Sequence, residues 1–176
     1  MSKLLTVLAL VSTLAARAAA SIGPVPVDVV MAGGTVFFVQ EKPREIEFLR
    51  VSEPVDKTKT GAARWRPANM KVLWLLGHDQ TTELKTRKYV GMEQIAYGQK
   101  YVEFSWVEGP LELQRNIEYR VELNMGSKFA KETFTITGDD AVLTSRSGSG
   151  QGKRRSYSVS VDKNGHKTLV PAAEGK

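Results

Sequence analysis

The chain has 176 residues, a formal net charge of +6 at pH 7 and no cysteine. This length suits one domain. Hydrophobic residues at 41% and charged residues at 25% are ordinary globular values, which argues against a collagen-like, fully disordered or polytopic membrane chain. The lack of cysteine excludes disulfide scaffolds, cysteine-ligated zinc, iron–sulfur clusters and thiol nucleophiles. Two histidines are too few for a multi-histidine metal site.

Residues 1–20 have the layout of a secretory signal peptide. Lys3 supplies positive charge, residues 4–14 form an apolar run, and three alanines at 18–20 supply a small-residue cleavage site, with Ala16 as a second site. The apolar run is too short for a bilayer span, which takes about twenty residues. A short buried or amphipathic helix is the alternative. We expect an exported protein, periplasmic or extracellular, with a mature chain that starts at Ser21 and has no transmembrane segment.

After this segment the apolar residues follow strand patterns. Short β-branched and aromatic runs at 25–31 and 35–40 flank Gly33-Gly34, a dipeptide typical of a two-residue hairpin turn. A period-2 element follows at residues 45–51. Residues 52–69 then form a polar connection of a length that is often functional or disordered when it has no structure of its own. Residues 70–76 are almost continuously apolar, as in a strand buried on both faces.

The second half of the chain continues the strand pattern. We expect strands at 84–90, 94–96, 101–107, 132–137 and 141–143, with turns at Tyr97-Gly98, at 124–127 and at Gly138-Asp139-Asp140. Residues 117–123 show the cleanest alternation in the chain. It predicts an inward face and a face toward water. The inward set is Ile117, Tyr119, Val121 and Leu123, and the outward set is Glu118, Arg120 and Glu122.

Composition changes near residue 145. Residues 145–156 are rich in glycine, serine and basic side chains, which indicates a flexible linker. Residues 157–161 and 167–170 then flank Asn164-Gly165, a strong hairpin signal. We therefore divide the chain into a signal peptide (1–20), a β-sandwich domain (21–144), the linker (145–156) and a C-terminal hairpin and tail (157–176).

Charge follows the same division. Residues 21–144 contain 16 basic and 17 acidic residues, whereas residues 145–176 contain 7 basic and 2 acidic ones, so these parts carry −1 and +5. Many short strands without a convincing amphipathic helix predict an all-β, antiparallel sandwich with this basic linker and hairpin at its C-terminus. A barrel is the alternative.

One short motif resembles a known family. In residues 113–121, Leu113 and Tyr119 are six apart and Val121 follows, which is similar to the E–F corner and F strand of fibronectin type III and related immunoglobulin-like domains. The resemblance implies that the leucine caps the core, that the tyrosine hydroxyl bonds back to the corner backbone, and that residues 132–137 form strand G. Trp74 would be the core tryptophan. Arg115-Asn116 replaces the usual Pro-Gly, and strands at both ends are additional. Because the fold has many uses, the resemblance implies no activity.

Catalytic and metal-binding motifs are absent from the sequence. His78 and Asp79 could form an acid–base pair or ligate a metal, but adjacent residues in an extended chain point to opposite faces, which favours a polar turn. His166 follows a hairpin turn, and Asp139-Asp140 supplies too few ligands for calcium. The glycine-rich segment at 147–152 lacks the flanking elements of a nucleophile elbow or phosphate loop. We expect no catalytic residue, no metal and no cofactor.

The candidate partner-binding residues are cationic and aromatic. They are Arg64, Trp65, Arg66, Lys153, Arg154 and Arg155. A tryptophan between arginines in a long loop is suited to a protein or anionic partner, and a lid folded over the core is the alternative. The basic clusters could equally be solvated surface, and without a reading motif we expect no nucleic acid partner.

These features predict an exported, non-catalytic binding or assembly module of the bacterial cell envelope that engages a protein partner. The alternative is a module that binds carbohydrate or another polyanion, such as an envelope glycan or anionic lipid. An enzyme that uses His78 and Asp79 is a third hypothesis.

Overall fold

The computed structural model describes residues 24–78, 89, 91–145 and 157–172, and these residues form an all-β fold. The first strands are β1 (Asp28–Ala32), β2 (Thr35–Glu45), β3 (Phe48–Pro54), β4 (Met70–Gly77), β5 (Gly91–Ala96) and β6 (Trp106–Glu108). The later strands are β7 (Glu118–Met125), β8 (Lys128–Ile136), β9 (Val142–Thr144), β10 (Tyr157–Val161) and β11 (Lys167–Pro171). Two short helices, α2 (Gly61–Arg64) and η2 (Pro67–Asn69), lie between β3 and β4.

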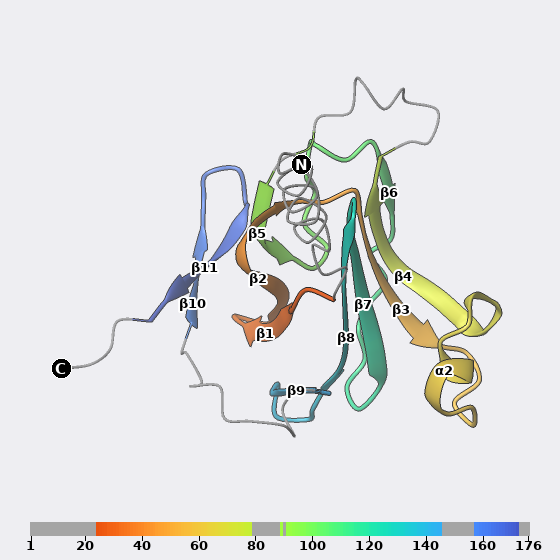
Figure 1. The fold of residues 1–176 in the computed structure, drawn as a ribbon. Helices are drawn as coiled ribbons and strands as arrows, with labels where there is room; N and C mark the ends of the chain where they lie inside the picture. The colour runs from red at the N-terminus through yellow and green to blue at the C-terminus, as the bar shows by residue number, and fades with distance from the viewer. Residues whose placement is uncertain (1–23, 79–88, 90, 146–156, 173–176) are drawn as a thin grey trace, which may run out of the picture.

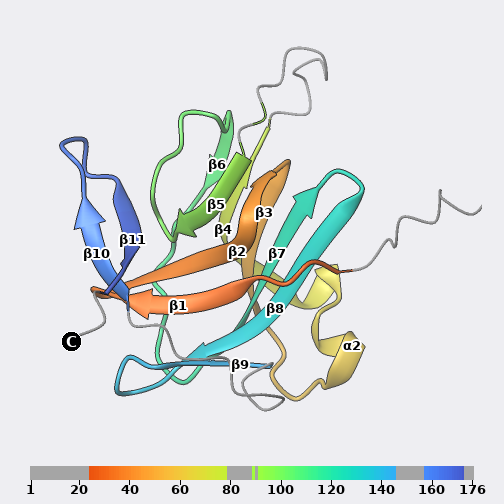
Figure 2. The same cartoon turned by 60° about the vertical axis from the view of Figure 1, so that its left-hand side comes forward.

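The strands form three antiparallel sheets. The three-stranded sheet has the order β1-β2-β5, and the six-stranded sheet has the order β6-β4-β3-β7-β8-β9. The hairpin β10–β11 is a separate sheet. Figures 1 and 2 show the three-stranded sheet between the hairpin on one side and the six-stranded sheet on the other. The all-β, antiparallel class predicted from the sequence is confirmed.

Local sequence explains how β1 and β2 form a hairpin. Ala32 pairs with Thr35, and Gly33 and Gly34 between them have φ angles of +52° and +71°, a left-handed conformation that glycine adopts without a side-chain clash. β2 continues past a register shift between Val39 and Arg44, and the chain then passes to the six-stranded sheet at β3. β2 and β3 therefore connect the two layers.

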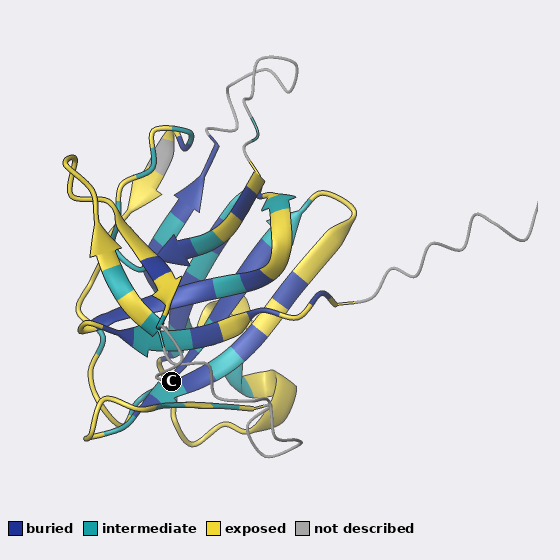
Figure 3. Cartoon of the chain, turned by 90° about the vertical axis from the view of Figure 1, so that its left-hand side faces the viewer, coloured by how far each residue is buried: buried dark blue, intermediate teal, exposed yellow. Residues whose placement is uncertain are grey.

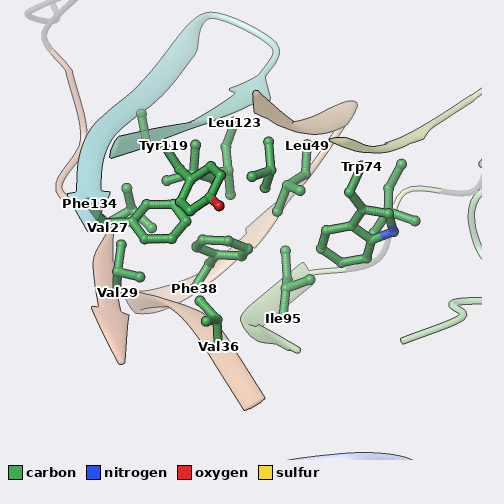
Figure 4. Packing of buried hydrophobic residues seen from close by; sticks show 14 of the residues in the cluster. Val27, Val29, Val36, Phe38, Leu49, Trp74, Ile95, Tyr119, Leu123 and Phe134 are labelled. Atoms are coloured by element: carbon green, nitrogen blue, oxygen red, sulfur yellow. The ribbon is translucent and has the colours of Figure 1, made fainter. Parts of the chain in front are cut away.

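The main core lies between the two larger sheets. Phe38 and Ile95 enter it from the three-stranded sheet, and Trp74, Tyr119 and Phe134 enter it from the six-stranded sheet (Figure 4). All five side chains are at most 1% exposed. The Phe38 and Phe134 rings meet edge to face with centroids 5.9 Å apart, a geometry that aromatic pairs prefer. Trp74 is thus a core residue, as expected.

The corner before β7 has the hydrogen bonds that the family resemblance implied. The Gln114 N–H donates to the Tyr119 hydroxyl at 2.6 Å, and that hydroxyl donates to the Gln114 carbonyl at 3.0 Å. Leu113 packs partly buried against the main core. Burial raises the pKa of Tyr119, so the hydroxyl stays protonated and can donate. The corner therefore fixes the start of β7 to the end of the sandwich.

Three expectations about individual segments need correction. Residues 52–69 are not one polar connection, because β3 continues to Pro54 and both short helices lie in the remainder. Residues 101–107 are mainly turn, and only Trp106–Glu108 is strand. Glu122 does not face water freely, since it is 9% exposed beneath two cations. The strand expected at 84–90 lies outside the described residues, except for Tyr89.

Candidate functional site

The segment that carries Arg64, Trp65 and Arg66 is held together by Asn69. The Asn69 side chain accepts a hydrogen bond from the Asp56 N–H at 2.9 Å and donates one to the Arg64 carbonyl at 2.8 Å. Its own backbone N–H bonds to the Arg66 carbonyl at 2.8 Å. Asn69 is 5% exposed, so these bonds form a buried scaffold beneath the loop. The scaffold gives Trp65 and its neighbours fixed backbone positions.

Trp65 lies half-buried against β7. The guanidinium carbon of Arg120 is 4.2 Å from the centre of the indole, and that of Arg64 is 6.0 Å away. Arg64 also pairs with Glu118 at 3.2 Å. Both distances to the ring are within cation–π range. Arg120 and Glu118 are outward residues of β7, so Trp65 covers the outer face of the six-stranded sheet. The alternative interpretation from the sequence, in which Trp65 folds over the main core as a lid, is therefore not what the structure shows.

Arg66 is an available cation next to Trp65. It is exposed, and no ion pair of Arg66 is present in the part of the chain that the structure describes. By contrast, the Arg120 guanidinium is partly buried under Trp65, and this burial lowers its pKa. Trp65 and Arg66 therefore combine a fixed aromatic side chain with an unengaged positive charge.

A row of ion pairs continues along the same outer face. Arg50 and Lys131, from the two strands that flank β7, both pair with Glu122, the latter at 3.5 Å. Burial would raise the pKa of Glu122, but the hydrogen bond and charge of Arg50, with the charges of Lys131 and Arg120, lower it overall. Glu122 is therefore ionised at neutral pH. The two carboxylates of this row, Glu118 and Glu122, are outnumbered by the cations around them, so the outer face carries net positive charge beside the loop of Trp65 and Arg66.

The remaining candidates are not brought to this surface. Lys153, Arg154, Arg155 and Asp79 lie outside the described residues. His78 is buried, with its ring centre 5.1 Å from that of Tyr89 and 5.4 Å from that of Phe104. This packing makes His78 part of an aromatic cluster, and no group of three potential metal-ligating side chains occurs within the described residues.

Asp139 and Asp140 act locally in the turn after β8. The Thr137 hydroxyl donates to Asp139, and this bond lowers the pKa of the Asp139 carboxyl. Arg115 donates to Asp140 at 3.0 Å from Nε. The two carboxylates thus have separate partners, as the turn interpretation predicts.

The structure also shows an open cavity of about 630 Å³ at the end of the sandwich. Its apolar lining includes Met31, Val36, Leu113, Ile136 and Tyr97, and its polar lining includes Glu112, Gln114, Arg115, Asp140 and Lys167. Sequence patterns do not predict this site, because five separate segments build it. The sequence does predict three of these segments, the Gly33-Gly34 turn, the tyrosine corner and the Asp139-Asp140 turn, but it does not predict that they meet at one end of the sandwich.

Comparisons with protein-family models, with curated proteins and with solved structures find no match. No helix within the described ranges is long and apolar enough to cross a membrane.

Proposed function

We propose that the sandwich has the topology of immunoglobulin-like domains. When β1, β2, β3, β4, β5, β7 and β8 are lettered A, B, C, C′, E, F and G, the sheets read A-B-E and C′-C-F-G. The Tyr119 hydroxyl bonds support this assignment, because a tyrosine near the start of strand F is typical of it. Two features are additional, since β6 and β9 extend the larger sheet. Trp74 would lie on C′, beside the strand where immunoglobulin domains carry their tryptophan.

We infer that the protein is an exported, non-catalytic binding or assembly module of the bacterial cell envelope and that it engages a protein partner. The observation that carries this proposal is the surface of Trp65 and Arg66. Tryptophan and arginine are enriched among residues that dominate binding energy at protein interfaces. Arg120 fixes one side of the indole before any partner arrives, and a preorganised side chain loses less entropy on binding.

The test is capture of partners from an envelope extract by the mature chain. Arg66→Glu should reduce capture, because it reverses the unengaged charge without removing a contact within the protein. Trp65→Ala should reduce it further, with only a small change in melting temperature because Trp65 lies off the main core. The matched control is Lys128→Glu, which reverses an exposed charge at the turn end of β8. Capture that is equally strong for wild-type protein and both loop variants would contradict the proposal.

The alternative function, binding of carbohydrate or another polyanion, is favoured by the cavity. Pockets of about 300–1,000 Å³ with apolar walls and a few polar groups are typical of small-ligand sites. Tyr97 supplies an aromatic wall, while Gln114 and Arg115 supply hydrogen-bond donors. Titration with peptidoglycan fragments should then shift NMR signals of Met31 and Tyr97, whereas Gln114→Ala should weaken the shifts. Shifts confined to the Trp65 loop would instead support the protein-binding site.

A polyanion has a separate signature. Binding of lipopolysaccharide or anionic vesicles through exposed charges should weaken steeply as salt is added, because screening shortens the reach of such charges. Deletion of residues 145–176 removes most of the net positive charge and should abolish this binding. Binding that persists in high salt and without these residues would argue against a polyanion.

A further inference from the structure

The C-terminal hairpin is bound to the three-stranded sheet through glutamine side chains. The Leu169 N–H donates to Gln94 Oε1 at 2.7 Å, and Gln94 Nε2 donates back to the Leu169 carbonyl at 3.4 Å. Gln99 Oε1 accepts from the Lys167 N–H at 2.7 Å. Among the described strands, neither strand of the hairpin pairs with a strand of the other two sheets. The side chain of Gln94 therefore supplies the donor and the acceptor that a neighbouring strand would offer to the backbone of β11 at Leu169.

Apolar packing completes this docking surface. Leu169 is 6% exposed and forms a buried cluster with Ala32, Phe37 and Ala96 of the three-stranded sheet. Val159 lies directly over the turn at Gly33, where an added Cβ would be 3.1 Å from Val159 Cγ2. Figure 3 shows the mostly exposed hairpin beside the three-stranded sheet, in which the first half of β2 is buried. The face of the sheet is thus fitted to a β-hairpin of this sequence.

The hairpin needs a sheet to pack on, whereas the three-stranded sheet needs only a cover over Phe37. None of the described residues 157–172 belongs to the main core. An isolated two-stranded hairpin is at best marginally stable in water, so β10 and β11 need a sheet to pack on. Without a hairpin, the three-stranded sheet would expose Phe37, which is 0% exposed here. Each of the two surfaces therefore requires an occupant, but the contacts do not require both to come from one chain.

The connection is long enough to reach another copy. Ser145 is fixed to β8, because its N–H donates to the Thr133 carbonyl at 3.1 Å and to Glu132 Oε1 at 3.1 Å. Eleven residues separate Ser145 from Tyr157. At up to 3.3–3.6 Å per residue, they span at most about 40 Å, which exceeds the diameter of about 30 Å of a small domain.

We propose that two copies of this chain exchange their C-terminal hairpins, each hairpin docking on the three-stranded sheet of the other copy. The exchange keeps every contact at Gln94, Phe37 and Leu169 and closes with two-fold symmetry, so it leaves no apolar face open. Exchange between copies competes with docking of the hairpin within its own chain, for which a short linker gives an effective concentration that is roughly millimolar. The exchanged dimer therefore increases with chain concentration. This inference is independent of the Trp65 surface.

A natural absence of cysteine makes the exchange directly measurable. An ideal Cβ on Gly33 is 3.4 Å from Val159 Cβ, close to the separation of about 3.5–4.5 Å in disulfides. A full-length chain with Gly33→Cys is mixed with one carrying Val159→Cys and oxidised. We expect a disulfide-linked heterodimer with a yield that rises with concentration. The matched control, Ser160→Cys, places the thiol on the next, exposed residue of β10 and should give little product. Equal yields from Val159→Cys and Ser160→Cys would overturn the proposal.

A second measurement avoids the turn at Gly33. Light scattering of the wild-type chain should show a dimer that grows as the concentration approaches the roughly millimolar range. Leu169→Asp places a charge in the docking cluster, so it should remove this dimer while the main core stays folded. A chain that remains monomeric throughout, or a dimer that survives Leu169→Asp, would show that hairpins are not exchanged.

Discussion

Phe37 and Phe38 are neighbours in β2, both are fully buried, and they belong to two different regions of the molecule. Phe38 points into the main core, where two sheets of backbone-paired strands enclose it. Phe37 points the other way, into the small cluster under the C-terminal hairpin. Equal burial therefore need not mean equal constraint. Among the described residues no backbone pairing joins the hairpin to either larger sheet, so we expect the hairpin to open from Phe37 separately.

The largest expected effect comes from comparing these two residues. Phe38→Ala should lower the free energy of unfolding by about 3–5 kcal/mol, as large-to-small core changes do. Phe37→Ala should lower it by no more than about 2 kcal/mol, since the loss is limited by the free energy of undocking the hairpin. Urea unfolding of both variants measures the difference. Equal losses would mean that the hairpin is an integral part of the cooperative core.

The same contrast separates what the sequence predicts from what it does not. Local signals predict strands and turns well, as Gly33-Gly34, Asn164-Gly165 and the apolar run of β4 show. These signals depend on neighbouring residues alone. The docking role of Gln94 has no such signal, because a glutamine in a short strand is otherwise an ordinary polar residue. Its function appears only when Leu169, 75 positions away, is placed beside it.

In the candidate site, too, local sequence predicts individual residues but not their long-range partners. The sequence singles out Trp65 between two arginines, but it does not predict Arg120 as the partner of the indole. The prediction that Glu122 faces water fails for a similar reason. Strand alternation gives its face correctly, but it does not predict that Arg50 and Lys131 on the flanking strands cover its carboxylate. Long-range pairing decides both cases. Surface chemistry built by three strands is therefore the least predictable part of this sequence.

The second prediction concerns the corner that closes the main core. Tyr119→Phe keeps the buried ring but removes the hydroxyl that bonds both the N–H and the carbonyl of Gln114. We expect a loss of about 2 kcal/mol, because removing one partner leaves backbone groups unsatisfied. Tyr101→Phe is the control, since its hydroxyl accepts one bond, from the Ala96 N–H, and its loss should be smaller. A Tyr119 variant as stable as the wild type in thermal unfolding would show that the corner bonds add nothing.

The third prediction tests the hairpin's attachment without changing its apolar contacts. Gln94→Leu removes both bonds to Leu169, so the β10–β11 ladder amides should exchange about tenfold faster, which corresponds to about 1.4 kcal/mol. Gln99→Leu removes only the bond to Lys167 and should have a smaller effect. Hydrogen exchange followed by NMR measures both variants, with amides of β7 as the internal reference. If the β7 amides accelerate to the same extent as the hairpin amides, the two regions open together and the proposed independence of the hairpin is wrong.

The smallest expected effect is the pH dependence at Glu122, on the face opposite the hairpin's sheet. Its pKa lies below the ordinary value of 4.5 because Arg50 and its neighbouring cations outweigh burial. The stabilisation is therefore fully present above the ordinary carboxyl pKa and is lost as the pH falls through the lowered pKa of the folded state. Arg50 is partly exposed, so we expect only about 1 kcal/mol at neutral pH. Glu122→Gln should be less stable than the wild type at pH 7, and the two free energies of unfolding should converge once the pH is below the lowered pKa of Glu122. Curves that stay parallel would place the contribution of Glu122 in packing and hydrogen bonding, because a charge effect must disappear when the wild-type carboxylate is protonated.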